Sequence, residues 1–252
     1  MRRLIGAVVT TAFLSGLCGA AMAADAKDAQ ATLDRAMQAL GGKDKLGKIK
    51  AVNLKSKGTL TLNGNDNEFT SHVTAEGLDH YRQEFEGQFQ GNAVKVVTVL
   101  AGEKGWRKVG DNSTELDRDA VANQKRTVYL QLIPVTLLPL TEKGFKVEPA
   151  GEEKVGDKAA VGLKVTPPDG KDFTLYFDKE SGLPVKLVAK VVGLQGGEYT
   201  QETTYSDYKD FEGIKKATRV ESKRDGEKFI QQQLTEFKTL DKVPPATFAE
   251  PQ

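Results

Sequence analysis

The sequence has 252 residues, of which 36 are lysine or arginine and 35 are aspartate or glutamate, so the net charge at neutral pH is +1. This balance argues against nucleic-acid binding, which usually needs a clustered basic face. The single cysteine, Cys18, excludes an intramolecular disulfide and a cysteine metal site.

The first 23 residues have the pattern of a secretory signal peptide. Arg2 and Arg3 precede an apolar run, Leu4 to Leu17, and Ala21-Met22-Ala23 then matches an A-x-A cleavage site. The run is shorter than the roughly 20 apolar residues that cross a bilayer, so we expect no stable transmembrane anchor. We expect export and cleavage after Ala23. Cys18 does not fit a lipidation site, because Leu17 fills a position that normally takes a small residue.

Residues 24–252 are expected to form one domain. Subtracting the 23 signal residues from 252 leaves 229, enough for one sizeable core, and no linker divides them. The first expected element is an amphipathic helix from Ala24 to Leu40, ended by Gly41 and Gly42. Four residues share its apolar face at helical spacing: Leu33, Ala36, Met37 and Leu40. We expect this helix to dock on the sheet of its own domain rather than on a membrane or a partner.

From Val52 onward the pattern changes to the two-residue alternation of strands with one solvated face. The segment Asn63 to Asn67 is expected to be a hairpin turn. It lacks the ordered ligands and the distal glutamate of a calcium-binding loop. Further strands are expected at Phe69–Ala75, Asp79–Glu86, Ala93–Leu100 and Trp106–Val109.

The middle of the chain holds a polar, helix-like segment and then the most apolar run outside the signal peptide. Asp117 to Tyr129 is expected to be a helix with an aspartate in its first turn. The run from Thr127 to Leu140 contains Pro134 and Pro139, and proline costs about 3 kcal/mol in a helix interior. We therefore expect a broken or irregular element there. It is either buried core or a lid over a cavity for an apolar ligand.

A second run of strands begins near Phe145. Its clearest hairpin joins Phe173–Phe177 to Val185–Val192. Later strands are expected at Tyr199–Tyr208, Lys216–Arg224 and Phe229–Leu240. The total is about ten or eleven strands, and their regular spacing is typical of an antiparallel sheet that curls or closes.

Catalytic chemistry has little support in this sequence. Outside the signal peptide there is no thiol, and no G-x-S-x-G elbow presents a nucleophile. His72 and His80 are about eight residues apart on one strand parity, too far to chelate one metal directly. We expect neither an enzyme nor a cofactor nor a bound metal. The alternative is a metal site in which the chain folds back at Gly77 and joins His72, Glu76 and His80.

Several short motifs follow one another along nearly all of residues 24–252. In order they are Gly41-Gly42 after the first helix, Tyr81-Arg82-Gln83-Glu84-Phe85, Gly105-Trp106-Arg107, Phe177-Asp178-Lys179-Glu180-Ser181-Gly182-Leu183-Pro184 and the segment Tyr205 to Gly213. Their order resembles the LolA-like superfamily of periplasmic lipoprotein carriers and outer-membrane lipoprotein-sorting proteins.

The resemblance implies a mainly β (α+β) fold: a strongly curved antiparallel sheet that forms an unclosed β-barrel, covered by an N-terminal helix and a central helical and apolar lid. It also implies a hydrophobic cavity for acyl chains. We therefore expect a periplasmic carrier of lipid or lipoprotein acyl chains, monomeric, with an acceptor protein of the inner or outer membrane as its candidate partner. The alternative is an envelope sensor or protein-interaction module with the same fold.

Such a cavity needs apolar area, because an acyl chain gains roughly 0.8 kcal/mol for each CH₂ removed from water. The residues expected to line it come from the strands and from the central segment. They are Leu60, Leu62, Phe85, Val97, Val99, Trp106, Leu132, Leu137, Leu138, Phe173, Leu175, Phe177, Leu187, Leu234 and Phe237. The alternative for each is ordinary hydrophobic core.

Overall fold

The computed structural model describes residues 17–252 except 90, 194 and 195, and it describes side chains from residue 27 onward. Most of the predicted signal peptide, residues 1–16, lies outside the described residues. The first helix, α1 (Leu17–Leu40), contains the expected helix and continues it toward the N-terminus. Cleavage after Ala23 therefore stays a prediction. In the described part of the chain no helix is long and apolar enough to cross a membrane.

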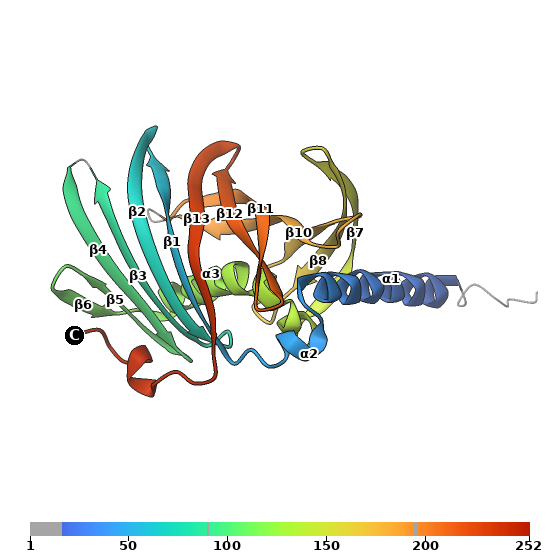
Figure 1. Ribbon diagram of the computed structural model, residues 1–252, viewed down its shortest axis with the longest axis horizontal. Helices are drawn as coiled ribbons and strands as arrows, with labels where there is room; N and C mark the ends of the chain where they lie inside the picture. The colour runs from blue at the N-terminus through green and yellow to red at the C-terminus, as the bar shows by residue number, and fades with distance from the viewer. Residues whose placement is uncertain (1–16, 90, 194–195) are drawn as a thin grey trace, which may run out of the picture.

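Thirteen strands form one antiparallel sheet in the order β6-β5-β4-β3-β2-β1-β13-β12-β11-β10-β9-β8-β7 (Figure 1). The first six strands are β1 (Ala51–Leu62), β2 (Asn65–Glu76), β3 (His80–Phe89), β4 (Asn92–Ala101), β5 (Lys104–Val109) and β6 (Asn112–Glu115). The other seven are β7 (Lys146–Val155), β8 (Lys158–Thr166), β9 (Phe173–Asp178), β10 (Pro184–Val192), β11 (Glu198–Phe211), β12 (Ile214–Arg224) and β13 (Glu227–Leu240). The sheet is strongly curved and its edge strands β6 and β7 stay unpaired with each other, which confirms the expected fold class. It has more strands than the ten or eleven expected.

The hairpin turns follow from local backbone chemistry. Asn63 and Gly64 both have positive φ, 50° and 77°, as the tight turn between β1 and β2 requires. The expected hairpin at this position is confirmed, since β1 and β2 pair from Ala51 with Glu76 to Leu62 with Asn65.

The long helix α3 (Arg118–Thr136) begins where the sequence predicted. Asp117 is its N-cap, and its carboxylate accepts a hydrogen bond from the Ala120 amide at 2.8 Å. Pro134 does not break the helix, because residues 132–135 are all buried and their packing offsets the cost of proline. The break lies at Leu137, whose φ of 61° is left-handed. A short 3₁₀ helix, η1 (Leu138–Thr141), follows.

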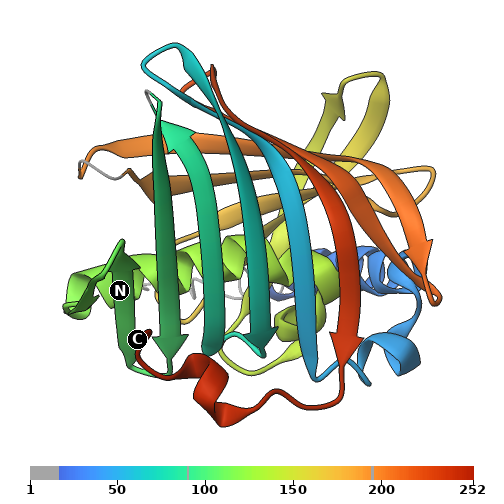
Figure 2. The same ribbon diagram turned by 60° about the vertical axis from the view of Figure 1, so that its left-hand side comes forward.

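We call the sheet face that packs on α3 the inner face and the opposite face the outer face. The Tyr81 hydroxyl on β3 donates a hydrogen bond to Oε1 of Gln131 on α3 at 2.7 Å, which places Tyr81 on the inner face. Cross-strand partners share a face. The register therefore places Leu54, Val73 and Leu100 on the inner face too. Figure 2 shows α3 crossing behind strands β1 to β4.

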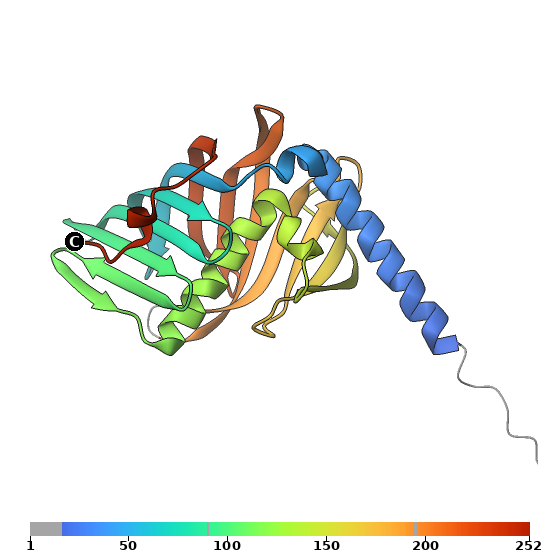
Figure 3. The same cartoon turned by 90° about the horizontal axis from the view of Figure 1, so that it is seen from below.

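The N-terminal helix contributes to the same core from another side. Leu33, Met37 and Leu40 are buried in the cluster that also contains the inner-face residues. Helix α1 contacts β7 and β12 and leads into the short helix α2 (Lys43–Leu46). One guanidinium nitrogen of Arg35 donates hydrogen bonds to the carbonyls of Lys179 and Glu180. Figure 3 shows that the other end of α1 projects away from the sheet.

The C-terminal segment covers part of the outer face. After β13 the chain forms a 3₁₀ helix, η2 (Pro245–Phe248), which contacts β3 and β4. The ring of Phe248 lies 5.4 Å from that of His80. Phe248 and Val243 belong to a second buried cluster, whose other buried members are Ala51, Val97 and Val99.

Candidate functional site

The candidate site is the interior between α3 and the inner face of the sheet. Helix α3 buries Val128, Ile133 and Val135, each at most 2% exposed, and its buried residues lie on more than one face of the helix. These three residues belong to one hydrophobic cluster with Leu163 of β8 and Leu187 of β10. A helix and the concave side of an unclosed sheet thus enclose an apolar interior.

Nine of the fifteen expected cavity residues lie in or against this interior cluster. Seven are buried members: Leu132, Leu137, Phe173, Leu175, Phe177, Leu187 and Phe237. Leu138 and Leu234 are partly buried and pack against them. The structure therefore brings together residues from β9, β10, β13, α3 and η1. Whether they contact a ligand stays a proposal.

Three further residues, Leu60, Leu62 and Phe85, are half-buried and lie outside that cluster. Phe85 on β3 stacks on Phe69 of β2, with ring centroids 5.1 Å apart, and lies 6.2 Å from Phe89. Sequence reasoning missed Phe69 and Phe89. Phe89 shares the strand parity of Phe85, so the two-residue alternation could have identified it.

The remaining three, Val97, Val99 and Trp106, do not lie with the others. Val97 and Val99 belong to the outer-face cluster beneath the C-terminal segment, and Trp106 packs against it. Trp106 is the cross-strand partner of Val99, so both point outward. The physical reason is that β4 is apolar on both faces, with Leu100 inside and Val99 outside. Alternation alone does not tell which parity points inward.

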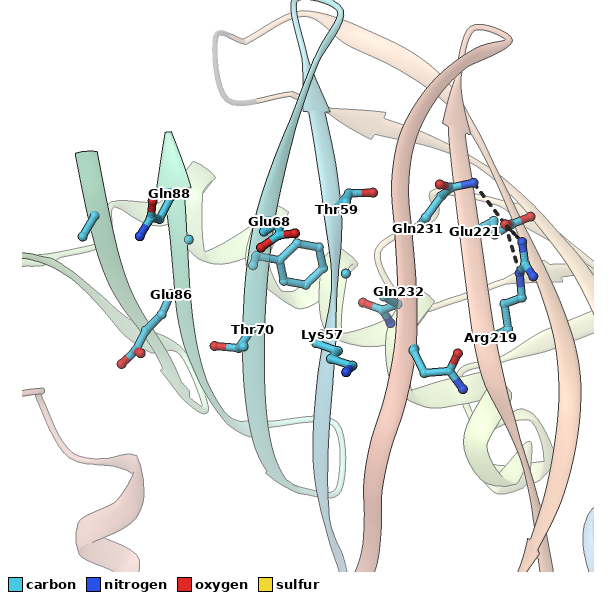
Figure 4. A pocket seen from close by; sticks show the side chains of 15 residues that line it. Lys57, Thr59, Glu68, Thr70, Glu86, Gln88, Arg219, Glu221, Gln231 and Gln232 are labelled. Carbon is cyan, nitrogen blue, oxygen red and sulfur yellow. Dashed lines mark hydrogen bonds and ion pairs between the residues drawn. The ribbon is translucent and has the colours of Figure 1, made fainter. Parts of the chain in front are cut away.

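A hollow of about 800 Å³ lies mainly on the outer face, across β3, β2, β1, β13 and β12 (Figure 4). Its lining is rich in charges and amides, including Glu86 and Lys57. Arg219 and Gln231 both hydrogen-bond to Oε1 of Glu221, at 2.7 and 3.1 Å. Gly58 is one of the lining residues, and a Cβ atom there would come within 2.1 Å of the Gln231 carbonyl oxygen, so glycine allows β1 and β13 to approach.

The two histidines do not form the metal site considered from the sequence. The chain does fold back at Gly77, and Glu76 pairs with His80. His72, however, pairs with Glu84, and its Nε2 lies 2.7 Å from Nδ2 of Asn53. Among the described residues there is no group of three or more histidine, cysteine, aspartate or glutamate side chains that could hold a metal.

Two buried titratable groups show how dry the protein interior is. Burial raises the pKa of Tyr81, while its hydrogen bond to Gln131 lowers it by less. Burial also lowers the pKa of Lys216 on β12 to about 8. Both shifts have the direction expected when the charged form loses its hydration.

Comparison of the sequence with family models and with curated proteins finds no match. Solved structures do resemble this one. A LolA superfamily protein from Nitrosomonas europaea has a TM-score of 0.57 at 12% identity, over 88% of this chain and 97% of that chain. A DUF1329 family protein from Desulfovibrio piger has a TM-score of 0.53 at 13% identity, with the same coverage. A Vibrio parahaemolyticus domain described as an outer membrane lipoprotein-sorting protein has a TM-score of 0.51 at 8% identity, over 86% of this chain and 97% of that chain. These likenesses confirm the LolA-like fold.

Proposed function

We propose that this protein, which has a LolA-like fold, is a periplasmic, non-enzymatic binder and carrier of lipid acyl chains, with a role in sorting lipids or lipoproteins to the outer membrane. The observation that carries the proposal is the apolar interior closed by one helix over an unclosed sheet. The structural likeness to a domain described as a lipoprotein-sorting protein supports it. In this proposal residues 1–23 are the export signal and residues 24–252 are the lipid-binding domain.

The chain order gives α3 a suitable position for a lid. Strands β6 and β7 are the two edges of the sheet, and α3 with η1 is the segment that joins them. The helix therefore lies between the two edges in the chain, and its buried valine, leucine and isoleucine residues belong to the interior cluster. Movement of α3 would uncover the inner face without breaking a strand pair.

The contacts of α3 are compatible with such movement. Its packing is mostly apolar, and apolar contacts are not directional. Its polar links to the sheet side include the Tyr81–Gln131 hydrogen bond and an ion pair between Lys125 and Glu103. An acyl chain entering beneath α3 would replace the apolar contacts that the helix gives up, at roughly 0.8 kcal/mol for each CH₂.

The first test is mass spectrometry of organic extracts from the protein, purified without detergent from the periplasm of a bacterial host beside a secreted control of similar size. Near-stoichiometric lipid is expected. Titration with a fluorescent fatty acid should show saturable binding. Repeated absence of both lipid and saturable uptake would contradict the carrier proposal.

An envelope sensor or protein-interaction module is the second candidate, and the outer hollow of about 800 Å³ favours it, because its charged lining suits a complementary protein surface better than an acyl chain. The two candidates differ in what happens to bound fatty acid. A carrier should transfer it to acceptor vesicles, whereas a sensor should retain it and change its affinity for a protein partner.

A further inference from the structure

A second, smaller hollow of about 290 Å³ lies where the first half of α3 meets strand β10. Its walls combine basic and acidic side chains with two valines. They are Asn123, Arg126, Lys171, Asp172, Lys190, Val191, Val192 and Glu198. These residues come from four separate parts of the chain. Val192 is 42% exposed, so the hollow has an apolar wall open to solvent.

The guanidinium of Arg126 is buried at this hollow, since the residue is only 4% exposed. Its Nη1 donates to the carbonyl of Lys171, and its Nη2 donates to the carbonyl of Asp172 at 2.7 Å. Its Nε is buried without a hydrogen-bond partner. Two of the five N–H groups of a guanidinium are thus used. A buried donor left unpaired is destabilising, and a bound acceptor would remove that cost.

The charges around Arg126 favour an anion. Lys171 and Lys190 are exposed at the rim. The carboxylate of Asp172 is already occupied, because it accepts hydrogen bonds from Thr166 at 2.6 Å and from Lys164 at 2.7 Å. Burial lowers the pKa of Arg126, and the nearby carboxylates of Asp169 and Asp172 oppose that shift. An arginine keeps its charge throughout the physiological range. The lining therefore has three cationic side chains, Arg126, Lys171 and Lys190. Apart from Asp172, its one other carboxylate is that of Glu198.

The hollow also borders the interior cluster. The guanidinium carbon of Arg126 lies 5.5 Å from the centroid of the Phe173 ring. Phe173 is buried in the interior cluster, against which Val191 also packs. A ligand with its anion at Arg126 would therefore have its apolar part beside Phe173, at the border of the interior cluster.

We infer that this hollow binds the oxyanion of an anionic amphiphile, such as the phosphate of a lipid headgroup, while the alkyl chain follows Phe173 into the interior. The inference rests on the proposed function and adds the headgroup class to it. Guanidinium groups suit phosphate because their N–H groups form paired, charge-assisted hydrogen bonds. Inorganic phosphate has the same oxygen chemistry, so an experiment must separate the two sources.

Isothermal titration calorimetry with dodecyl phosphate, dodecanol and sodium phosphate makes that separation. Dodecanol reports on acyl binding alone, and sodium phosphate reports on the anion alone. Dodecyl phosphate is expected to bind at least tenfold more tightly than either. Arg126→Gln should reduce the affinity for dodecyl phosphate about tenfold and leave dodecanol binding within twofold. Arg118→Gln, which removes an exposed arginine from the same helix, is the matched control and should change neither.

Arg126→Gln removes a buried side chain and could misfold, so a second test uses the double variant Lys171→Gln with Lys190→Gln. Both lysines are exposed, so this variant should fold normally. It should weaken dodecyl phosphate binding about threefold to fivefold. Equal affinity for dodecanol and dodecyl phosphate would overturn the headgroup site and leave the carrier proposal standing. If sodium phosphate binds as tightly as dodecyl phosphate, the ligand of the hollow is a free anion and not a lipid headgroup, and the inference is overturned. Failure of dodecanol and dodecyl phosphate alike would overturn the carrier proposal and this inference with it.

Discussion

Two apolar surfaces of one sheet are covered by two different segments. Helix α3 covers the inner face, and its connections run to both sheet edges, β6 and β7. The C-terminal segment with η2 covers a patch of the outer face and is attached only through β13. The inner cluster contains residues from α1, α3 and most strands, whereas the outer cluster has five buried members. Both covers, α3 inside and the C-terminal segment outside, contribute packing, and in the proposed function the inner cover also encloses the ligand.

The largest expected effect tests the outer cover. Phe248→Ala should lower the free energy of unfolding by about 4 kcal/mol, because a buried phenylalanine loses its packing on the outer cluster. Urea denaturation measures this. Fatty-acid binding by the folded variant should keep its stoichiometry and affinity. Glu250→Ala, at an exposed position of the same segment, is the control and should stay within about 0.5 kcal/mol of the parent. If folded Phe248→Ala no longer binds fatty acid, the outer cover is also needed for ligand binding, and the proposed difference between the two covers is contradicted.

The matching change beneath the inner cover is Ile133→Ala on α3. It should lower the free energy of unfolding by about 3 kcal/mol and leave a cavity, since Ile133 is fully buried. Unlike the outer variant, it should raise the affinity for a fluorescent fatty acid, because the new space lies where the acyl chain is proposed to bind. Ile133→Val should cost about 1 kcal/mol and change binding little. Unchanged binding in Ile133→Ala would place the ligand elsewhere.

A buried lysine, Lys216 on β12, makes the stability of the protein depend on pH. Burial holds the pKa of Lys216 at about 8, below its ordinary value of 10.5. Between these values the unfolded chain binds a proton that the folded protein does not, so stability should rise as the pH increases from about 8 to 10.5 and stay flat below. Lys216→Met should remove this rise and stabilise the protein at pH 7 by about 2–3 kcal/mol. Thermal unfolding from pH 6 to 10 measures both effects, and a parallel pH profile in the variant would contradict them.

The smallest expected effect concerns the attachment of the inner cover. Tyr81→Phe removes the hydroxyl that donates to Gln131 and should lower the free energy of unfolding by about 1 kcal/mol. Stopped-flow uptake of a fluorescent fatty acid should become several-fold faster, because α3 is held less firmly. Tyr129→Phe removes a hydroxyl from α3 itself and is the control. Equal uptake rates in the parent and Tyr81→Phe would show that this hydrogen bond does not limit entry.

Much of the fold could be predicted because local chemistry determines it. The Asn63-Gly64 turn, the N-cap at Asp117 and the alternation in the second strand run each depend on neighbours in the sequence. Strand β6 could not be predicted in this way. Its four residues, Asn112–Glu115, are all polar, and only pairing with β5 makes them a strand.

The site was less predictable because it depends on contacts between distant segments. Val99 and Leu100 are equally apolar, and only the packing of α3 and η2 decides which of them faces the interior. Arg126 stands in a polar stretch that predicts an exposed helix face. It is buried because Lys171 and Asp172, more than 40 residues later, bring their carbonyls to its guanidinium.

The connection from β6 through α3 to β7 also has a mechanical consequence. A helix of 19 residues is about 28 Å long, whereas the same residues fully extended reach about 65 Å. An intact α3 therefore acts as a tether of fixed length between the two edges of the sheet. The edges can separate widely only if turns of α3 unwind, so the width of the opening and the helix content of the protein should change together.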